Sequence, residues 1–277
     1  MSKQQKVWFI TGSSRGFGRV WAEAALKRGD KVAATARDIK SLHPLVETYA
    51  DSVLPLQLDV ADRKAVFEAV GRANHHFGSI DVILGNAGYG CMGAIEEVSF
   101  EEIKANYETN VFGTLSVIQA ALPILRAQKS GHIITVSSIG GVIGFPTGGI
   151  YTSTKFAVEA FSEALAGEVA GFGIKVTILE PGSFKTGFRD SAKFVPPAAE
   201  YDGVRKAVFA RFKPELAGDP AATGDAILKL VDSDTPPLRL ILGTGTLQMF
   251  RQTYASRLET WEKWEAVSNA AQGGQHA

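Results

Sequence analysis

The sequence predicts an α/β fold built on a doubly wound, seven-stranded parallel sheet in a single domain. Short apolar runs alternate with helical segments along most of the 277 residues, which is the pattern of a parallel sheet covered by helices on both faces. Apolar residues make up 45% of the chain, enough to fill the core of such a domain. Residues of phosphate-binding and catalytic type follow several of the runs, and ligands of this fold class bind at the carboxyl ends of the strands.

The first predicted strand, Val7 to Ile10, leads into a glycine-rich turn. The turn reads Thr-Gly-Ser-Ser-Arg-Gly-Phe-Gly over residues 11–18, and a helical stretch follows from Arg19 to Lys27. Glycine lets a backbone approach a pyrophosphate closely, and a helix N-terminus offers free N–H groups and partial positive charge to the anion. This order predicts a dinucleotide site, with a plain glycine-rich loop as the alternative.

The remaining strands and helices follow in alternation. Further strands are expected at Lys31–Ala36, Val53–Leu58, Ile80–Leu84, Ile133–Val136, Ile174–Leu179 and Leu238–Leu242. Helices are expected near Ala61–Phe77, Phe100–Ala127 and Tyr151–Ala170. Right-handed crossovers between these strands would produce the doubly wound sheet.

Three regions are expected within the domain. Residues 6–187 form the cofactor and catalytic core. Residues 188–218 are too long for an ordinary loop and predict one or two short helices that form a substrate lid, with a non-catalytic surface insertion as the alternative. Residues 244–277 form a C-terminal helix and tail, in which the amphipathic stretch 247–267 packs on the core or a partner subunit and residues 270–277 fray.

Tyr151 and Lys155 lie four residues apart and therefore share one face of a predicted helix. Ser138 ends another apolar run, and a glycine-rich loop joins that run to Tyr151, so a strand end and a helix start can direct a hydroxyl and a phenol to one point. A phenol can transfer a proton, and a nearby ammonium together with the positive ring of a bound nicotinamide is expected to lower its pKa from about 10. The alternative is that both residues belong to the polar stripe of an amphipathic helix.

These features occur in an order that resembles the short-chain dehydrogenases/reductases, in their shorter single-domain soluble branch. The matching motifs are the turn at 11–18, Asp59-Val60, Asn86-Ala87-Gly88, Asn110, Ser138, Tyr151 with Lys155, and Pro181-Gly182 followed by Thr186. Each motif is weak alone, but seven in order over roughly residues 6 to 190 are specific. The resemblance implies a Rossmann fold and hydride transfer between a nicotinamide and a carbonyl or alcohol carbon.

The resemblance also implies the role of each matching residue. The implied catalytic residues are Asn110, Ser138, Tyr151 and Lys155. Tyr151 would be the general acid/base, Ser138 would hold the substrate oxygen, Lys155 would bond the nicotinamide ribose, and Asn110 would form a helix irregularity that relays protons through water. The implied cofactor-binding residues are Gly12, Ser14, Arg15, Gly16, Phe17, Gly18, Arg37, Asp59, Val60, Asn86, Ala87, Gly88, Tyr151, Lys155, Pro181, Gly182 and Thr186.

Some of these residues have simpler interpretations. Asn110 alone would be an ordinary polar helix residue, Asp59 a helix cap, and Asn86 a tie between strands. The cofactor is expected to be NADP(H), with NAD(H) possible, because Ala36 stands where an acid would bind the ribose 2′-OH, and Arg37 follows it. Asp38 is the reason to keep NAD(H) open, since it could pair with Arg37 or bind the ribose.

The substrate is expected to be a small lipophilic ketone, aldehyde or secondary alcohol. The candidate pocket wall is largely apolar and comprises Gly140, Val142, Phe145, Pro146, Phe184, Phe188 and Phe194. Three alternatives stay open: an NAD-dependent oxidative alcohol dehydrogenase, a non-catalytic dinucleotide-sensing protein on the same fold, and a sugar epimerase or dehydratase of the longer family branch.

Bulk properties exclude several other classes. Lys plus Arg and Asp plus Glu are 29 each, and no basic run occurs, so no nucleic-acid partner is expected. No run of about 18 apolar residues and no signal peptide is present, and Cys91 is the single cysteine, so a cytoplasmic protein without a membrane span or disulfide is expected. The histidines lack metal-ligand spacing, so no metal is expected. The family resemblance implies a homodimer or homotetramer.

Overall fold

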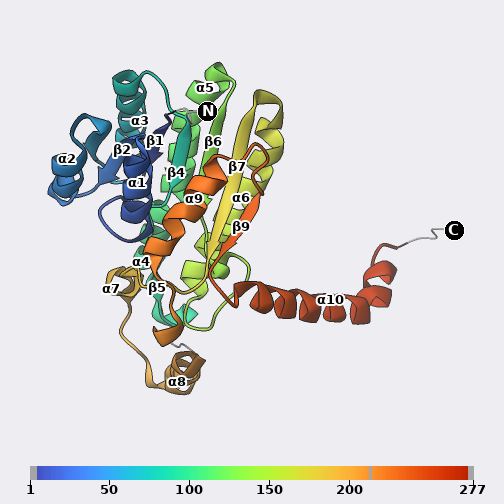
Figure 1. Cartoon of the computed structure of the whole chain (residues 1–277). Coiled ribbons are helices and arrows are strands. Elements are labelled where there is room, and N and C mark those ends of the chain that lie inside the picture. The colour runs from blue at the N-terminus through green and yellow to red at the C-terminus, as the bar shows by residue number, and fades with distance from the viewer. Residues whose placement is uncertain (1–4, 212–213, 274–277) are drawn as a thin grey trace.

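A computed structural model describes residues 5–211 and 214–273, in which a parallel sheet lies between two layers of helices (Figure 1). The sheet has the strand order β3-β2-β1-β4-β6-β7-β9, and every neighbouring pair in it is parallel. Its strands are β1 (Val7–Ile10), β2 (Lys31–Ala36), β3 (Val53–Gln57), β4 (Val82–Gly85), β6 (Gly131–Val136), β7 (Ile174–Pro181) and β9 (Arg239–Leu242). The predicted doubly wound, seven-stranded parallel sheet is confirmed.

Alternate residues of β1 show that the sheet is buried on both faces. Trp8 and Ile10 lie in one hydrophobic cluster and Phe9 lies in the other, and all three are fully buried. The first cluster includes residues of α1 (Gly16–Arg28), α2 (His43–Tyr49) and α9 (Thr223–Val231). The second includes residues of α3 (Arg63–Phe77), α5 (Gly113–Gln128) and α6 (Gly149–Val169). The sequence patterns predicted neither α2 nor α9.

Local sequence signals explain where several helices begin and end. Asp62 caps α3 by accepting a backbone N–H at 3.0 Å, and Gly78 ends that helix in the left-handed conformation. A capping box formed by Ser99 and Glu102 starts α4 (Phe100–Tyr107). Short 3₁₀ turns lie at Ile39–Leu42, Ala50–Ser52, Ile95–Glu97, Ile139–Gly141, Ala170–Phe172, Ala199–Tyr201, Pro214–Leu216 and Pro220–Ala222.

The helix expected at 100–127 is interrupted by a π-helical turn. This turn spans Glu108–Phe112 and separates α4 from α5, so Asn110 stands at its centre. Among the described residues, Phe100–Gln128 is the one helical run long and apolar enough to cross a membrane, and 56% of its apolar window is buried inside the protein.

The region expected to form a lid lies at the end of the sheet opposite the N-terminus (Figure 1). It contains α7 (Phe188–Ser191) and α8 (Asp202–Arg211), and residues 212–213 of this region lie outside the described residues. Between the two helices, β8 (Lys193–Phe194) pairs with β5 (Cys91–Met92) in a small parallel sheet. Near the C-terminus, α10 (Thr246–Ala270) is a single long helix, and the fraying expected to residue 277 falls largely outside the described residues.

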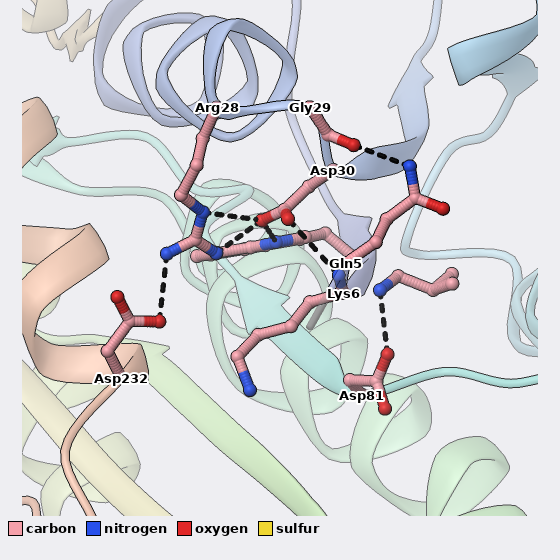
Figure 2. Close-up of polar contacts among 9 residues, drawn as sticks. Gln5, Lys6, Arg28, Gly29, Asp30, Asp81 and Asp232 are labelled. Carbon is pink, nitrogen blue, oxygen red and sulfur yellow. Dashed lines mark hydrogen bonds and ion pairs between the residues drawn. The ribbon is translucent and has the colours of Figure 1, made fainter. Parts of the chain in front are cut away.

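A polar network closes the sheet at the amino ends of the strands (Figure 2). The carboxylate of Asp30 is 2% exposed and accepts hydrogen bonds from Trp8 Nε1 at 2.8 Å, the Lys6 backbone N–H at 3.1 Å and the Arg28 guanidinium. Arg28 also pairs with Asp232 at 2.9 Å, which ties α1 to the end of α9. These contacts tie the amino ends of the strands to α1 and α9, whereas the candidate site lies at the carboxyl ends of the strands.

Candidate active site

The glycine-rich turn after β1 forms a tight cradle that a larger residue would fill. A Cβ atom on Gly18 would stand 2.3 Å from the carbonyl oxygen of Gly12, closer than any real contact. Gly12 and Gly16 have φ values of 70° and 57°, which favour glycine. Arg15 stands at the N-cap of α1 without a side-chain capping bond, and the first turn contains no acid. The free N–H groups and the close backbone approach fit a bound pyrophosphate.

Thr11 and Asn86 join the glycine loop to the end of β4. The Thr11 hydroxyl accepts the backbone N–H groups of Asn86 and Ala87 at 2.9 and 3.0 Å. The Asn86 amide in turn donates to the carbonyl oxygens of Thr11 and Gly12 at 2.9 and 3.2 Å. Asn86 therefore acts as the tie between strands that its position suggested. Thr11 is a supporting residue to which sequence reasoning assigned no role, although the motif contains it.

Asn110 is fully buried at the π-helical turn, and its side chain is saturated by hydrogen bonds. Its Oδ1 accepts the backbone N–H of Tyr89 at 3.0 Å. Its Nδ2 donates to the Tyr89 carbonyl oxygen and to Thr154 Oγ1, both at 3.0 Å. Asn110 therefore fixes the loop after β4 against the helix that carries Tyr151 and Lys155. The irregular helix expected at this residue is present.

Lys155 lies buried between α6 and the end of β6. Its Nζ donates to the carbonyl oxygen of Val136 at 2.8 Å. A Cβ atom on Gly88 would stand 3.5 Å from Nζ and 3.0 Å from Asn110 Oδ1, so the backbone after β4 passes directly beside both side chains. Burial lowers the pKa of Lys155 to about 8, and the nearby Glu159 carboxylate opposes this shift.

Tyr151 and Ser138 lie within hydrogen-bonding reach of one another. A Cβ atom on Gly140 would stand 3.5 Å from both Ser138 Oγ and Tyr151 Cε1. Lys155 Nζ lies 5.9 Å from the centroid of the Tyr151 ring. Tyr151 is 9% exposed, and the ring of Phe188 packs against it with the centroids 5.3 Å apart.

In the protein without cofactor the pKa of Tyr151 is raised, whereas the expected lowering relied on Lys155 together with a bound, positively charged nicotinamide ring. Burial raises the pKa of Tyr151 to about 12, and a hydrogen bond with Ser138 lowers it only in part. Lys155 Nζ lies 5.9 Å from the centroid of the Tyr151 ring and does not offset the desolvation of the phenolate. At neutral pH the phenol therefore keeps its proton.

The segment after β7 approaches the glycine loop from the other side. A Cβ atom on Gly16 would stand 3.1 Å from the carbonyl oxygen of Thr186, so Thr186 closes over the cradle. Gly182, which follows Pro181, donates its backbone N–H to Leu242 at 2.9 Å. The Pro181-Gly182 stretch is thus fixed at the end of the sheet, and the chain continues to Thr186 beside the loop.

Residues at the expected adenosine end are more exposed. Arg15 and Arg37 are both exposed on the surface. Asp38 caps a 3₁₀ turn by accepting the Lys40 backbone N–H at 3.0 Å, and no ion pair between Asp38 and Arg37 occurs in the described part of the chain. Asp59 is also exposed, and its carboxylate accepts a backbone N–H within its own turn at 3.0 Å.

Val60 and Ser14 complete the set of expected cofactor residues. Val60 is buried, and a Cβ atom on Gly113 would stand 2.8 Å from its side chain, so Val60 packs against the start of α5. Ser14 and Phe17 are partly buried in the glycine loop. The Phe17 ring stacks on Trp21 with the centroids 4.8 Å apart, which leaves its backbone to face the cradle.

The expected pocket wall is only partly assembled around Tyr151. Gly140 and Phe188 lie beside the phenol. The ring of Phe184 instead packs against Phe17 at 5.2 Å, and Val142 lines a separate groove beside α10. Phe194 is 51% exposed on β8.

A buried charge cluster behind the site is absent from the sequence prediction. Glu159 lies one helical turn after Lys155, and its Oε2 accepts from Arg239 Nε at 3.0 Å. Glu180, at the end of β7, is 2% exposed and lies 3.6 Å from the same Arg239 nitrogen. Burial and the neighbouring Glu159 raise the pKa of Glu180 to about 7. No local pattern reveals this cluster, because its members come from α6, β7 and β9.

Cys91 is a buried free thiol, and burial raises its pKa, which suits a structural residue. Within residues 5–211 and 214–273, no group of three or more His, Cys, Asp or Glu side chains could hold a metal ion.

A parallel sheet with a glycine cradle and the side chains of Ser138, Tyr151 and Lys155 at its carboxyl edge is the arrangement expected of a nicotinamide-dependent oxidoreductase. The family model described as short chain dehydrogenase matches residues 6–193. The chain therefore belongs to the short-chain dehydrogenase family, whose enzymes act on CH–OH and C=O groups with NAD(P).

Two named relatives match over nearly the whole chain. Oxidoreductase BOA17 of Botryotinia fuckeliana is 42% identical over 271 residues, which cover 96% of this chain and 99% of that protein. The 3-ketodihydrosphingosine reductase of Bacteroides thetaiotaomicron is 37% identical over 255 residues, which cover 90% and 92%.

Solved structures agree with the fold and the class of cofactor. A short-chain dehydrogenase from Streptomyces avermitilis is 38% identical, has a TM-score of 0.90 and covers 97% of this chain and 98% of that one. An alcohol dehydrogenase from Thermococcus sibiricus, complexed with 5-hydroxy-NADP, is 27% identical with a TM-score of 0.74 and covers 88% and 98%. A 3-ketoacyl-(acyl-carrier-protein) reductase from Brucella melitensis, complexed with NADH, is 25% identical with a TM-score of 0.75 and covers 87% and 98%.

Proposed function

We propose that this protein is an NADP(H)-dependent reductase of lipophilic ketones or aldehydes, with Tyr151 as the general acid/base. The observation that carries the proposal is the buried meeting point of Tyr151 and Ser138, one helical turn from the anchored Lys155. When bound, the nicotinamide would supply or accept the hydride. The residues at this point would handle the substrate oxygen and its proton.

The protonation state of Tyr151 supports the reductive direction. Ser138 would donate a hydrogen bond to the substrate carbonyl oxygen and hold it beside the phenol. As the carbonyl oxygen gains negative charge, the Tyr151 O–H would deliver its proton, and the resulting phenolate would be stabilised by the nearby Lys155 ammonium. The oxidation of an alcohol requires the phenolate instead, and burial disfavours that state in the protein without bound cofactor.

Asn110 would act mainly as a positioning residue in this scheme. Its amide bonds hold Tyr89 and Thr154, so its direct effect is to fix the backbone around Lys155. Water bound near the π-helical turn would complete the proton relay to Lys155. The cofactor would lie from the glycine cradle past Ala87 and Gly88 to the Thr186 segment.

The preference for NADP(H) rests on Ala36 and Arg37 at the end of β2. Ala36 is buried and provides no carboxylate for a ribose 2′-OH, and Arg37 is exposed at the position where a 2′-phosphate would lie. Arg15 would supply a second positive charge from the glycine loop. The carboxylate of Asp38 already caps the following turn, so it is less suited to bind the ribose.

The lipophilic substrate is supported by the apolar surroundings of Tyr151. Phe188 from α7 packs on the phenol, and the small β5–β8 sheet connects the lid to the loop after β4. The relative named 3-ketodihydrosphingosine reductase acts on a ketone, and its name supports a ketone with a long apolar chain as the first compound to test.

The proposal also covers the oligomeric state of the protein and its location in the cell. We infer pairing through the surfaces of α5 and α6, where Phe156 is 39% exposed, into a homodimer or homotetramer. The single buried thiol of Cys91 suits the reducing cytoplasm.

A substrate screen tests the proposed function. Purified protein is mixed with a panel of hydrophobic ketones and aldehydes, and loss of reduced nicotinamide absorbance is followed with NADPH and separately with NADH. Turnover of at least one lipophilic ketone, faster with NADPH, is expected. Turnover only of alcohols with NAD would favour the oxidative alternative. Tight dinucleotide binding without turnover of any panel member would favour a dinucleotide-sensing role.

A further inference from the structure

The outer half of α10 has no support from the rest of the protein. Its base is fixed by the buried Thr246 and Phe250 and by Arg257, whose Nη2 donates to the Val142 carbonyl oxygen at 2.7 Å. Beyond Arg257 every residue to Ala270 is exposed, and the helix projects away from the sheet and its helices (Figure 1). An isolated helix of roughly 13 residues is only marginally stable in water, so the outer half of α10 needs a binding partner to stay helical.

One side of α10 carries an apolar stripe with the spacing of a helix-pairing seam. Leu247, Tyr254 and Trp261 recur every seven residues, and Phe250 and Trp264 each lie three residues after Leu247 and Trp261 respectively. Trp261 and Trp264 are 62% and 63% exposed. Two large aromatic side chains exposed on an unsupported helix indicate an interaction surface.

Charge is segregated along α10 in a way that suits antiparallel self-association. The base, residues 246–257, contains two arginines and no acid, which gives a charge of +2. The tip, residues 258–270, contains three glutamates and one lysine, which gives −2. The opposite charges of the base and the tip therefore favour a second α10 that runs in the opposite direction.

A groove lies beside the base of α10, where the tip of such a second helix would fit. It encloses about 500 Å³ and is lined on the body side mainly by Val142, Ile241 and Arg239. On the helix side it is lined by Tyr254 and Leu258 together with residues of the preceding turns. The groove thus exposes the same stripe that continues onto the unsupported tip.

We propose that α10 pairs antiparallel with α10 of a second copy of this chain, so that each tip lies in the groove at the base of the other. A two-fold axis at Leu258 brings the stripes together. In that register Arg251 meets the partner's Glu265 twice by symmetry, and Leu258 meets its own copy at the axis. Tyr254 then lies beside the partner's Trp261.

The surface area that a stable dimer buries shows why the groove must be part of the proposed interface. Half-exposed aromatic side chains contribute about 100 Å² each, so the stripe alone would bury roughly 400 Å² per protomer. Stable dimers bury about 1,200 Å² or more in total, so the helices must also cover groove walls such as Val142 and Ile241. A membrane surface is the weaker occupant, because the net −2 charge of the tip would be repelled by anionic lipids.

Crosslinking of the full chain tests this pairing, because Cys91 is the only natural cysteine and is buried. Leu258→Cys places a thiol near the proposed axis, and Met249→Cys places one on the opposite side of the same helix at similar exposure. A short bismaleimide should link Leu258→Cys chains into dimers and leave Met249→Cys chains largely monomeric on a denaturing gel. Equal crosslinking of the two variants would overturn the proposal.

Charge reversal provides a second test that does not depend on thiols. Arg251→Glu should raise the dissociation constant of the α10-mediated step about tenfold in sedimentation equilibrium, and Arg251→Glu with Glu265→Arg should restore it. No rescue in the double variant would overturn the antiparallel register. If the protein bound neutral phosphatidylcholine vesicles and Leu258→Cys chains did not crosslink, the outer half of α10 would be assigned to membrane binding instead.

Discussion

The ammonium of Lys155 is anchored on the carbonyl oxygen of Val136 at 2.8 Å, which joins α6 directly to the carboxyl end of β6. Val136 lies two residues before Ser138, so one contact sets the distance between the helix that carries Tyr151 and the loop that carries Ser138. This hydrogen bond therefore fixes the helix that carries Tyr151 against the strand that leads to Ser138. This rigidity favours a bound geometry that needs little rearrangement during proton transfer.

Tyr151→Phe should remove turnover and leave cofactor affinity nearly unchanged, because only the transferable proton is lost. We expect the rate constant to fall about 10²–10⁴-fold, the usual contribution of a positioned acid. Turnover is measured on the best ketone of the screen, and cofactor binding by quenching of protein fluorescence. Tyr49→Phe, far from the site, is the control and should retain full activity. Wild-type activity in Tyr151→Phe would refute the assignment.

Gly18→Ala should weaken dinucleotide binding strongly. The new methyl group would stand 2.3 Å from the Gly12 carbonyl oxygen, so the cradle must open to accept it. The matched control is Gly71→Ala in α3, where a Cβ would meet nothing within 4 Å. That control should bind cofactor normally and gain about 0.5–1 kcal/mol in stability from helix propensity. Calorimetric titration with NADPH measures both variants, and equal affinities would argue against the cradle.

Arg37→Asp should shift the preference from NADPH toward NADH. The substitution removes the proposed phosphate ligand and places a carboxylate near the ribose 2′ position. The ratio of kcat/KM for the two cofactors should change by more than tenfold, about 1.4 kcal/mol. Arg72→Asp, an exposed change of the same charge on α3, is the control for net charge. A ratio that moves equally in both variants would exclude a specific role for Arg37.

Much of the site could be predicted from sequence because its parts are local motifs at strand ends. The glycine turn, the Tyr151–Lys155 spacing and the position of Ser138 depend on residues close together in the chain. The pKa of Tyr151 could not be predicted, since it depends on how deeply Phe188 and the surrounding elements bury the phenol. The cluster of Glu159, Glu180 and Arg239 could likewise not be predicted, because its members are distant from one another in the sequence.

Glu180→Gln should change how stability depends on pH. The folded-state pKa of Glu180 is raised to about 7 from 4.5, so its protonated form stabilises the fold below pH 4.5 and this contribution is lost as pH rises through 7. The neutral amide does not titrate. Relative to wild type, the variant should therefore gain stability between about pH 4.5 and 7, by at most about 1.4 kcal/mol per pH unit.

Urea unfolding of Glu180→Gln and wild type at several pH values measures this difference. Glu163→Gln serves as the control, because Glu163 is largely exposed and its pKa is lowered by Arg239. A pH-independent difference between Glu180→Gln and wild type would show that the buried pair does not hold an extra proton.

His132 should make the fold sensitive to mild acid. It is 4% exposed on β6, where its Nε2 lies 2.9 Å from Thr177 Oγ1, and burial lowers its pKa to about 3 from 6.5. In the unfolded chain the imidazole takes up a proton below pH 6.5, whereas in the folded chain it stays neutral until about pH 3. The unfolded state therefore gains protons across this window, and stability falls as pH decreases, by at most about 1.4 kcal/mol per pH unit.

His132→Gln keeps a polar side chain within reach of Thr177 but cannot take up that proton. Its stability at pH 8 should be somewhat lower than that of wild type, and its loss of stability between pH 6.5 and 4.5 should be clearly smaller. The exposed His75, near the end of α3, provides the control substitution His75→Gln, whose pH profile should match wild type. If the stability of His132→Gln and wild type changed with pH in the same way, protonation of His132 would not destabilise the folded state. That result would contradict a pKa lowered by burial.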